Sequence, residues 1–172
     1  MPKWWPQKGK SNQADLAHQA EEQAYQATVT ELRQQFADQR QAGISRQAIL
    51  KQIQSISQAL EQAEMTPPHK GRLRAYDQAF AELRSDLMRI LQTGRAMEIA
   101  GRVDEAISYY ETAVTEQMST RFPYEHLRII YRQRQQYADA RRICQAALQN
   151  PFLPPEDKAH FQTWADKLAA AS

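Results

Sequence analysis

A repeat with a period of 34 residues constrains this 172-residue chain more than any other feature. When residues 101–114 are aligned with residues 135–148, Ala106 falls on Ala140 and Ala113 on Ala147. The same offset pairs Val103 with Tyr137, Tyr110 with Cys144, Val114 with Leu148, Ile90 with Tyr124 and Met97 with Tyr131. Small residues at matched places let paired helices approach closely, and larger residues fill the space between one pair and the next.

The boundaries of the two units follow from turn and helix signals. In the first unit, Ala100-Gly101-Arg102 makes the turn and residues 103–117 form the second helix. In the second unit, Phe122 opens the first helix, Gln135-Gln136 makes the turn, and residues 137–149 form the second helix before Pro151. Residues 155–170, in which Phe161, Trp164 and Leu168 share a face, predict a helix that caps the array.

These matches resemble the tetratricopeptide repeat family, over about residues 87–152. The chain departs from the family pattern at Arg128, where a small residue is usual, and at Gln135, where the turn has glycine. The resemblance implies a groove, lined by the first helix of each unit, that takes an extended or helical peptide. In this register the groove residues are Met88, Leu91, Arg95, Glu98, Ile99, Phe122, Glu125, Ile129, Arg132 and Gln133. The alternative is that some of them are buried against the N-terminal helices.

One use of that family is not expected here. The clamp for a chain-terminal carboxylate needs asparagine beside lysine or arginine on the groove helices, and no asparagine occurs between Asn12 and Asn150.

The residues before the repeat predict two further helices and an extended third. Ser11 or Asn12 can cap a first helix that Gly43 ends, and Ser45 can cap a second. The second helix carries a heptad seam of Ile49, Ile53, Ile56, Leu60 and Ala63. This seam packs within the chain or supports a homo-oligomer through the N-terminal helices.

The third helix follows Pro67, and we expect it to belong both to the N-terminal bundle and to the first repeat unit. Gly71 is expected to delay its start by a turn. The fold class is therefore all-α. It comprises an irregular tail (1–10), a helical hairpin (11–66), and a tetratricopeptide-like array with an extended first helix and a cap (67–172).

The tail MPKWWPQKGK carries Trp4 and Trp5 between lysines. They dock on a partner, on the chain's own helices or weakly on a membrane surface, and the sequence leaves these three readings open. No apolar segment follows the basic start, so we expect neither a secretion signal nor a membrane span. The single cysteine fits a reducing compartment, and we expect a cytoplasmic protein.

The chain shows no pattern typical of catalysis. Cys144 falls at a packing position of the repeat, and the four histidines lack metal-ligand spacing. Phosphate-binding glycine loops and nucleophile motifs are missing from the sequence. We therefore expect no catalytic residue, no cofactor and no metal ion.

Six arginines lie between residues 121 and 142, at positions 121, 128, 132, 134, 141 and 142, with Tyr124, Tyr131 and Tyr137 among them. Such a cluster binds acidic protein, a phosphate-rich ligand or RNA, or is only a solvated face.

Together these features predict a non-catalytic adaptor or assembly factor that binds a partner protein through the groove and the arginine-rich face, which includes Arg128, with the tryptophan tail as an extra anchor. The alternatives are a nucleic-acid-binding protein that uses residues 121–142 and a structural subunit of a larger complex. The sequence does not identify the partner.

Overall fold

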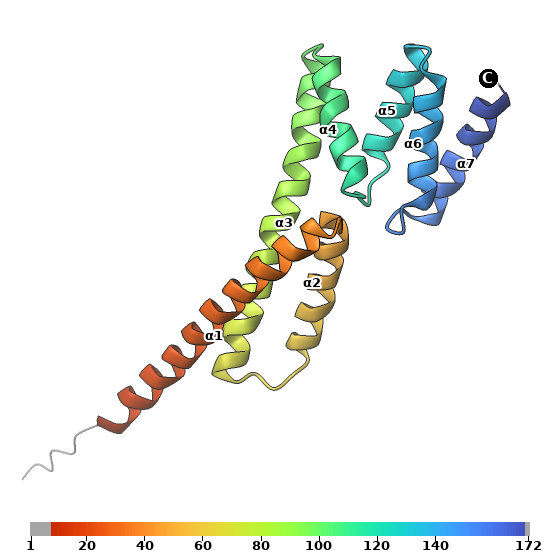
Figure 1. Ribbon diagram of the computed structural model, residues 1–172. Coiled ribbons are helices and arrows are strands. Elements are labelled where there is room, and N and C mark those ends of the chain that lie inside the picture. Colours follow the sequence, from red (N-terminus) through yellow and green to blue (C-terminus); the bar gives the residue numbers. More distant parts are fainter. Residues whose placement is uncertain (1–7, 171–172) are drawn as a thin grey trace, which may run out of the picture. The chain divides into compact units, whose positions relative to one another are not determined.

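The computed structural model describes residues 8–170 and confirms the all-α fold (Figure 1). Within those residues α1 and α3 are long, with 34 and 33 residues, and the helices from α4 onward are shorter. The helices are α1 (Lys8–Gln41), α2 (Arg46–Glu61), α3 (Pro67–Ile99), α4 (Val103–Thr115), α5 (Phe122–Gln133), α6 (Tyr137–Gln149) and α7 (Pro155–Ala170). Trp4 and Trp5 lie outside the described residues.

The chain forms two compact units. Unit 1 comprises the described residues up to Ile44 and Ile49–Glu82, and unit 2 comprises Ser45–Ala48 and the described residues from Leu83 onward. Helix α3 contributes to both units, which is the double role that the sequence predicts for it.

In unit 1, α1 crosses α3 at Gly71. A Cβ atom on Gly71 would lie 2.1 Å from the carbonyl oxygen of Glu21 and 2.9 Å from the amide nitrogen of Tyr25. The expectation that Gly71 delays the start of α3 is wrong, because the helix begins at Pro67. Gly71 instead permits the backbones of α1 and α3 to cross closely, because glycine has no side chain.

The α1–α2 connection has the caps that the sequence predicts. Gly43 takes a positive φ of 77°, and the amide of Ile44 donates to the carbonyl of Gln39 at 3.0 Å. Ser45 Oγ accepts a hydrogen bond from the amide of Ala48 at 3.2 Å, as an N-cap does. Helix α1 begins at Lys8, before the expected caps Ser11 and Asn12, so neither of these residues caps it.

Most of the heptad seam of α2 is buried within the chain. Ile49, Ile53 and Leu60 are buried and Ile56 is half-buried. Ala63 is exposed because α2 ends at Glu61.

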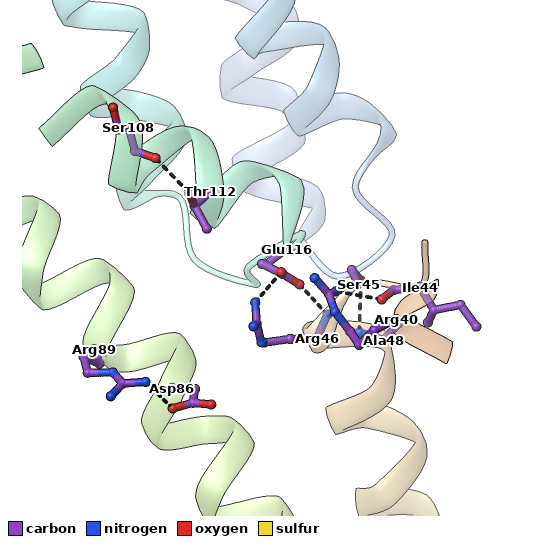
Figure 2. A network of polar contacts seen from close by, with 10 residues as sticks. All are labelled: Arg40, Ile44, Ser45, Arg46, Ala48, Asp86, Arg89, Ser108, Thr112 and Glu116. Carbon is purple, nitrogen blue, oxygen red and sulfur yellow. Dashed lines mark hydrogen bonds and ion pairs between the residues drawn. The ribbon is translucent and has the colours of Figure 1, made fainter. Parts of the chain in front are cut away.

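The first turn of α2 belongs to unit 2, where it is held by the segment that follows α4. Figure 2 shows Arg46 beside the buried carboxylate of Glu116. Glu116 accepts hydrogen bonds from the Arg46 amide at 2.6 Å and from its Nη1 at 2.5 Å. Ser45 Oγ donates to Oε1 of Gln117 at 2.8 Å. An acid at this place offsets the positive end of the α2 dipole.

In unit 2 the 34-residue period extends to the backbone. Gly101 and Gln135 both have positive φ, at 75° and 59°. The amide of Arg102 donates to the carbonyl of Met97 at 2.9 Å, and its counterpart Gln136 donates to Tyr131 at 2.8 Å. Gln135 therefore adopts the turn conformation in which the family pattern has glycine, at the steric cost that a side chain carries there.

The departure at Arg128 is explained by an exchange of volume. A Cβ on Gly94 of α3 would lie 2.8 Å from Cε1 of Tyr110, so the glycine makes room for a buried tyrosine on α4. The equivalent pair in the next unit is Arg128 and Cys144, both buried. Here the large side chain is on the first helix and the small one on the second, so the two pairs both fill their space.

Asn150 ties together the ends of three segments of unit 2. Its side chain is 1% exposed, and Nδ2 lies 3.1 Å from the Gln117 carbonyl, 3.0 Å from the Met118 carbonyl and 2.7 Å from the Tyr124 hydroxyl. Its Oδ1 accepts from the amide of Phe152 at 2.9 Å. The residue that ends α6 thus also satisfies the carbonyls of the loop before α5.

We expect Gly71→Ala to lower the free energy of unfolding by about 1–3 kcal/mol, because the new methyl group overlaps the α1 backbone. Alanine is the better helix former, so propensity alone predicts the opposite sign. Urea unfolding followed by circular dichroism measures the change. Ser55→Ala, at an exposed position of α2, is the control and should leave stability unchanged or slightly raised.

We expect Asn150→Asp to lower the free energy of unfolding at pH 7 by about 2–3 kcal/mol, because a carboxylate cannot donate to the buried carbonyls of Gln117 and Met118. The neighbouring change Gln149→Glu makes the same chemical replacement at an exposed site and should be nearly neutral. Equal effects of the two changes in thermal unfolding would contradict this role of Asn150.

Candidate binding surface

Helix α5 is joined by polar side chains to α3 on one side and to α7 on the other. The carboxylate of Glu98 accepts a hydrogen bond from the Tyr110 hydroxyl at 2.7 Å and lies 2.7 Å from Nδ1 of His126. Glu125 Oε2 lies 2.9 Å from Nε2 of His160. We call the side of unit 2 formed by the second half of α3, by α5 and by α7 the A-helix face.

His126 and His160 are 34 residues apart, and each contacts a carboxylate of the preceding helix of this face. Leu127 and Phe161, also 34 apart, are both fully buried. Helix α7 therefore takes the place of a first helix in a third unit. This confirms the expected position of the cap helix, whose Phe161 and Leu168 face the core.

An aromatic cluster lies where α3 and α5 meet. The rings of Phe122 and His126 stack with centroids 3.9 Å apart, and Tyr110 meets Phe122 edge to face at 5.8 Å. The guanidinium of Arg95 lies 6.0 Å from the Phe122 centroid. These contacts bring Arg95 and Glu98 of α3 together with Phe122 and His126 of α5.

All ten groove residues predicted from the repeat register keep some exposed area. Met88 is 42% and Ile99 77% exposed, which is unusual for apolar side chains of this size. Arg95, Arg132 and Gln133 are also exposed, while Leu91, Glu98, Phe122, Glu125 and Ile129 are half-buried. Arg128 differs, because only 3% of it is exposed and its guanidinium stacks on Trp164 at 3.8 Å.

The arginines of residues 121–142 are mostly engaged with carboxylates. The ion pairs join Arg121 to Asp157, Arg128 to Glu125, Arg134 to Asp104, and Arg142 to Glu111 and Asp139. Within the described part of the chain, Arg132 and Arg141 form no ion pair. Tyr124 and Tyr131 are buried, so of the three interleaved tyrosines only Tyr137 is exposed. Four of the six arginines are therefore paired, although the side chains of Arg121, Arg134 and Arg142 remain 38–51% exposed.

The pKa values of the bridging groups follow from burial and pairing. Burial alone would raise the pKa of Glu125, but hydrogen bonds from Arg128 and His160 outweigh it and lower the pKa below the ordinary 4.5. The pKa of Glu111 is lowered in the same way, since Arg142 and Tyr131 outweigh its burial. Burial and the bond to Glu111 raise the pKa of Tyr131 to about 12. Glu125 and Glu111 are thus ionised at neutral pH, each paired with an arginine.

Cys144 is buried, and burial raises the pKa of its thiol to about 11. The thiolate that a nucleophile requires is disfavoured by this environment. Among residues 8–170, histidine, cysteine and carboxylate side chains gather in no group that could hold a metal ion. Over the same residues, none of the helices combines the length and apolar character that crossing a membrane demands.

Searches of protein-family models, of curated proteins and of solved structures find no match to this chain.

Sequence reasoning missed four residues that form or support the A-helix face, one of them on α4. They are Tyr110, His126, His160 and Lys167, of which the first three hold the helices together and the last lies beside Trp164. The offset of 34 residues between His126 and His160 could have identified these two histidines. Lys167 carries no such signal, although the ring that it contacts, Trp164, lies three residues earlier in the same helix.

We expect Glu125→Gln to lower the free energy of unfolding at pH 7 by about 3 kcal/mol, because it leaves the buried Arg128 cation without its carboxylate. Because the folded pKa of Glu125 is depressed, its contribution is present above pH 4.5 and is lost as the pH falls through the folded value. The variant should therefore lose less stability than the wild type on acidification. Urea unfolding at a series of pH values measures both effects.

Glu105→Gln provides the control for this prediction. Glu105 pairs with Arg102, and both side chains are about half exposed. Its replacement should change the stability by less than about 1 kcal/mol at any of these pH values.

Proposed function

We propose that unit 2 is a degenerate tetratricopeptide-type array and that this chain is a non-catalytic adaptor that holds a segment of a partner protein on its A-helix face. The array is supported by the 34-residue period in residues, in turn conformation and in backbone hydrogen bonds. The exposed apolar residues Met88 and Ile99 on the predicted groove support the adaptor. Exposed apolar groups rimmed by polar ones are typical of interaction sites.

The character of the partner segment is indicated by the unpaired charges of the face. Glu98 and Glu125 are already bonded to protein donors. Arg95, Arg132 and Lys167 form no ion pair within residues 8–170. These three unpaired cations complement a segment that carries acidic residues beside apolar anchors.

The test is capture of partners from the native cells by tagged full-length chain, after nuclease treatment and at moderate salt, followed by mass spectrometry. We expect the double variant Met88→Ser/Ile99→Ser to retain about a tenth or less of the partner, because two apolar anchors are lost. The matched control Tyr109→Ser/Tyr137→Ser removes two exposed apolar side chains from α4 and α6 and should retain it.

Equal retention by both double variants would overturn the adaptor on this face. If nuclease removes all bound material, the chain is instead a nucleic-acid-binding protein, and residues 121–142 become its first candidate site.

A further inference from the structure

Three cations surround the single indole of Trp164 on α7. The guanidinium carbon of Arg128 lies 3.8 Å from the ring centroid, Nζ of Lys167 4.9 Å and the guanidinium carbon of Arg132 5.3 Å. Arg128 and Arg132 are one turn apart on α5, and Trp164 and Lys167 are three residues apart on α7. We call these four residues the Trp164 cation cluster.

The described residues leave this positive charge unbalanced. Glu125 pairs with Arg128 and is shared with His160, and neither Arg132 nor Lys167 has a carboxylate partner in the described part of the chain. Each cation is attracted to the indole, but like charges gathered around one ring repel one another. An anion placed among them would offset that repulsion.

Arg128 adds a second and independent observation. The side chain is almost fully buried, and its Nη1 has no hydrogen-bond partner. Buried donors of this kind are rare, because leaving one unpaired costs about 1–3 kcal/mol. Arg128 thus keeps a positive charge with one unsatisfied donor directly beneath the two exposed cations Arg132 and Lys167, and an anion held by those two would offset it.

We propose that the Trp164 cation cluster binds a carboxylate side chain of the acidic partner segment. Arg132 and Lys167 hold the carboxylate through charge-assisted hydrogen bonds, and Arg128, fixed between Glu125 and Trp164, is a positioning residue. This inference rests on the proposed function, whose partner segment it describes further. A nucleic acid fits less well, because its repeated phosphates need a basic track and most neighbouring arginines are already paired.

The test uses the indole as the reporter. The chain has three tryptophans, so the full-length variant Trp4→Phe/Trp5→Phe leaves Trp164 as its only indole. The probe is an acetylated and amidated peptide of four glutamates, with the four-glutamine peptide as its neutral counterpart, titrated at constant ionic strength. We expect a saturable change of Trp164 emission with the glutamate peptide and none with the glutamine peptide.

Substitutions in this background locate the binding. We expect Arg132→Gln and Lys167→Gln each to weaken binding of the glutamate peptide about tenfold, as the loss of one charge-assisted contact implies. Arg141→Gln removes the same charge from an exposed arginine without an ion pair and should change it less than about twofold. Thermal unfolding of each variant verifies that it is folded.

Three results would overturn the proposal. One is the absence of a saturable signal with the glutamate peptide. Another is that Arg141→Gln weakens binding of the peptide as much as Arg132→Gln and Lys167→Gln do, which would mean unspecific attraction. The third is a saturable response to inorganic phosphate at the same ionic strength without one to the glutamate peptide, which would assign the cluster to phosphate.

The outcome is separable from that of the proposed function. Suppose that the glutamate peptide binds through Arg132 and Lys167, while Met88→Ser/Ile99→Ser retains as much partner as the wild type. The carboxylate site then stands and the proposed adaptor surface is overturned. If capture depends on Met88 and Ile99 while the glutamate peptide gives no signal, the adaptor stands and the carboxylate site is overturned.

Discussion

Helices α4 and α6 lie close to their neighbours because four alanines leave their inner sides without bulk. Ala106, Ala113, Ala140 and Ala147 are all completely buried. A larger side chain at any of these places would separate the helices and break the packing of the aromatic residues around them. The arrangement of α5 between α3 and α7, and with it the A-helix face, depends on this close spacing.

Although the alanines fix the spacing of the helices, the side-chain volume between two paired helices is divided differently in the two units. Gly94 with Tyr110 and Arg128 with Cys144 fill equivalent places with opposite choices of size. The second choice puts a cation inside the array, and that cation brings Glu125 and Trp164 to it. The choice of arginine at position 128 therefore places positive charge beside Trp164 of α7.

Periodicity and turn chemistry in the sequence are sufficient to predict the helices and the register of the repeat, because both act over a few residues. Gly43, Ser45 and Gly101 stand at the places where the chain turns or a helix is capped. The role of Gly71 could not be predicted in this way, since the clash that it avoids is with Glu21, fifty residues earlier. The same holds for the carboxylate of Glu116, whose partner Arg46 is 70 residues away. The groove residues came from the repeat register, whereas the burial of Arg128 depends on Trp164 in another helix.

Asn150 also bears on the chemical lifetime of the protein. Asparagine deamidates when the backbone nitrogen of the next residue attacks its side-chain carbonyl and forms a cyclic imide. Hydrolysis of the imide then gives aspartate. The residue after Asn150 is Pro151, which has no backbone N–H to make that attack. The side chain is also held by four hydrogen-bond contacts. Conversion of Asn150 to aspartate would leave the carbonyls of Gln117 and Met118 without this donor, and the proline makes that conversion slow.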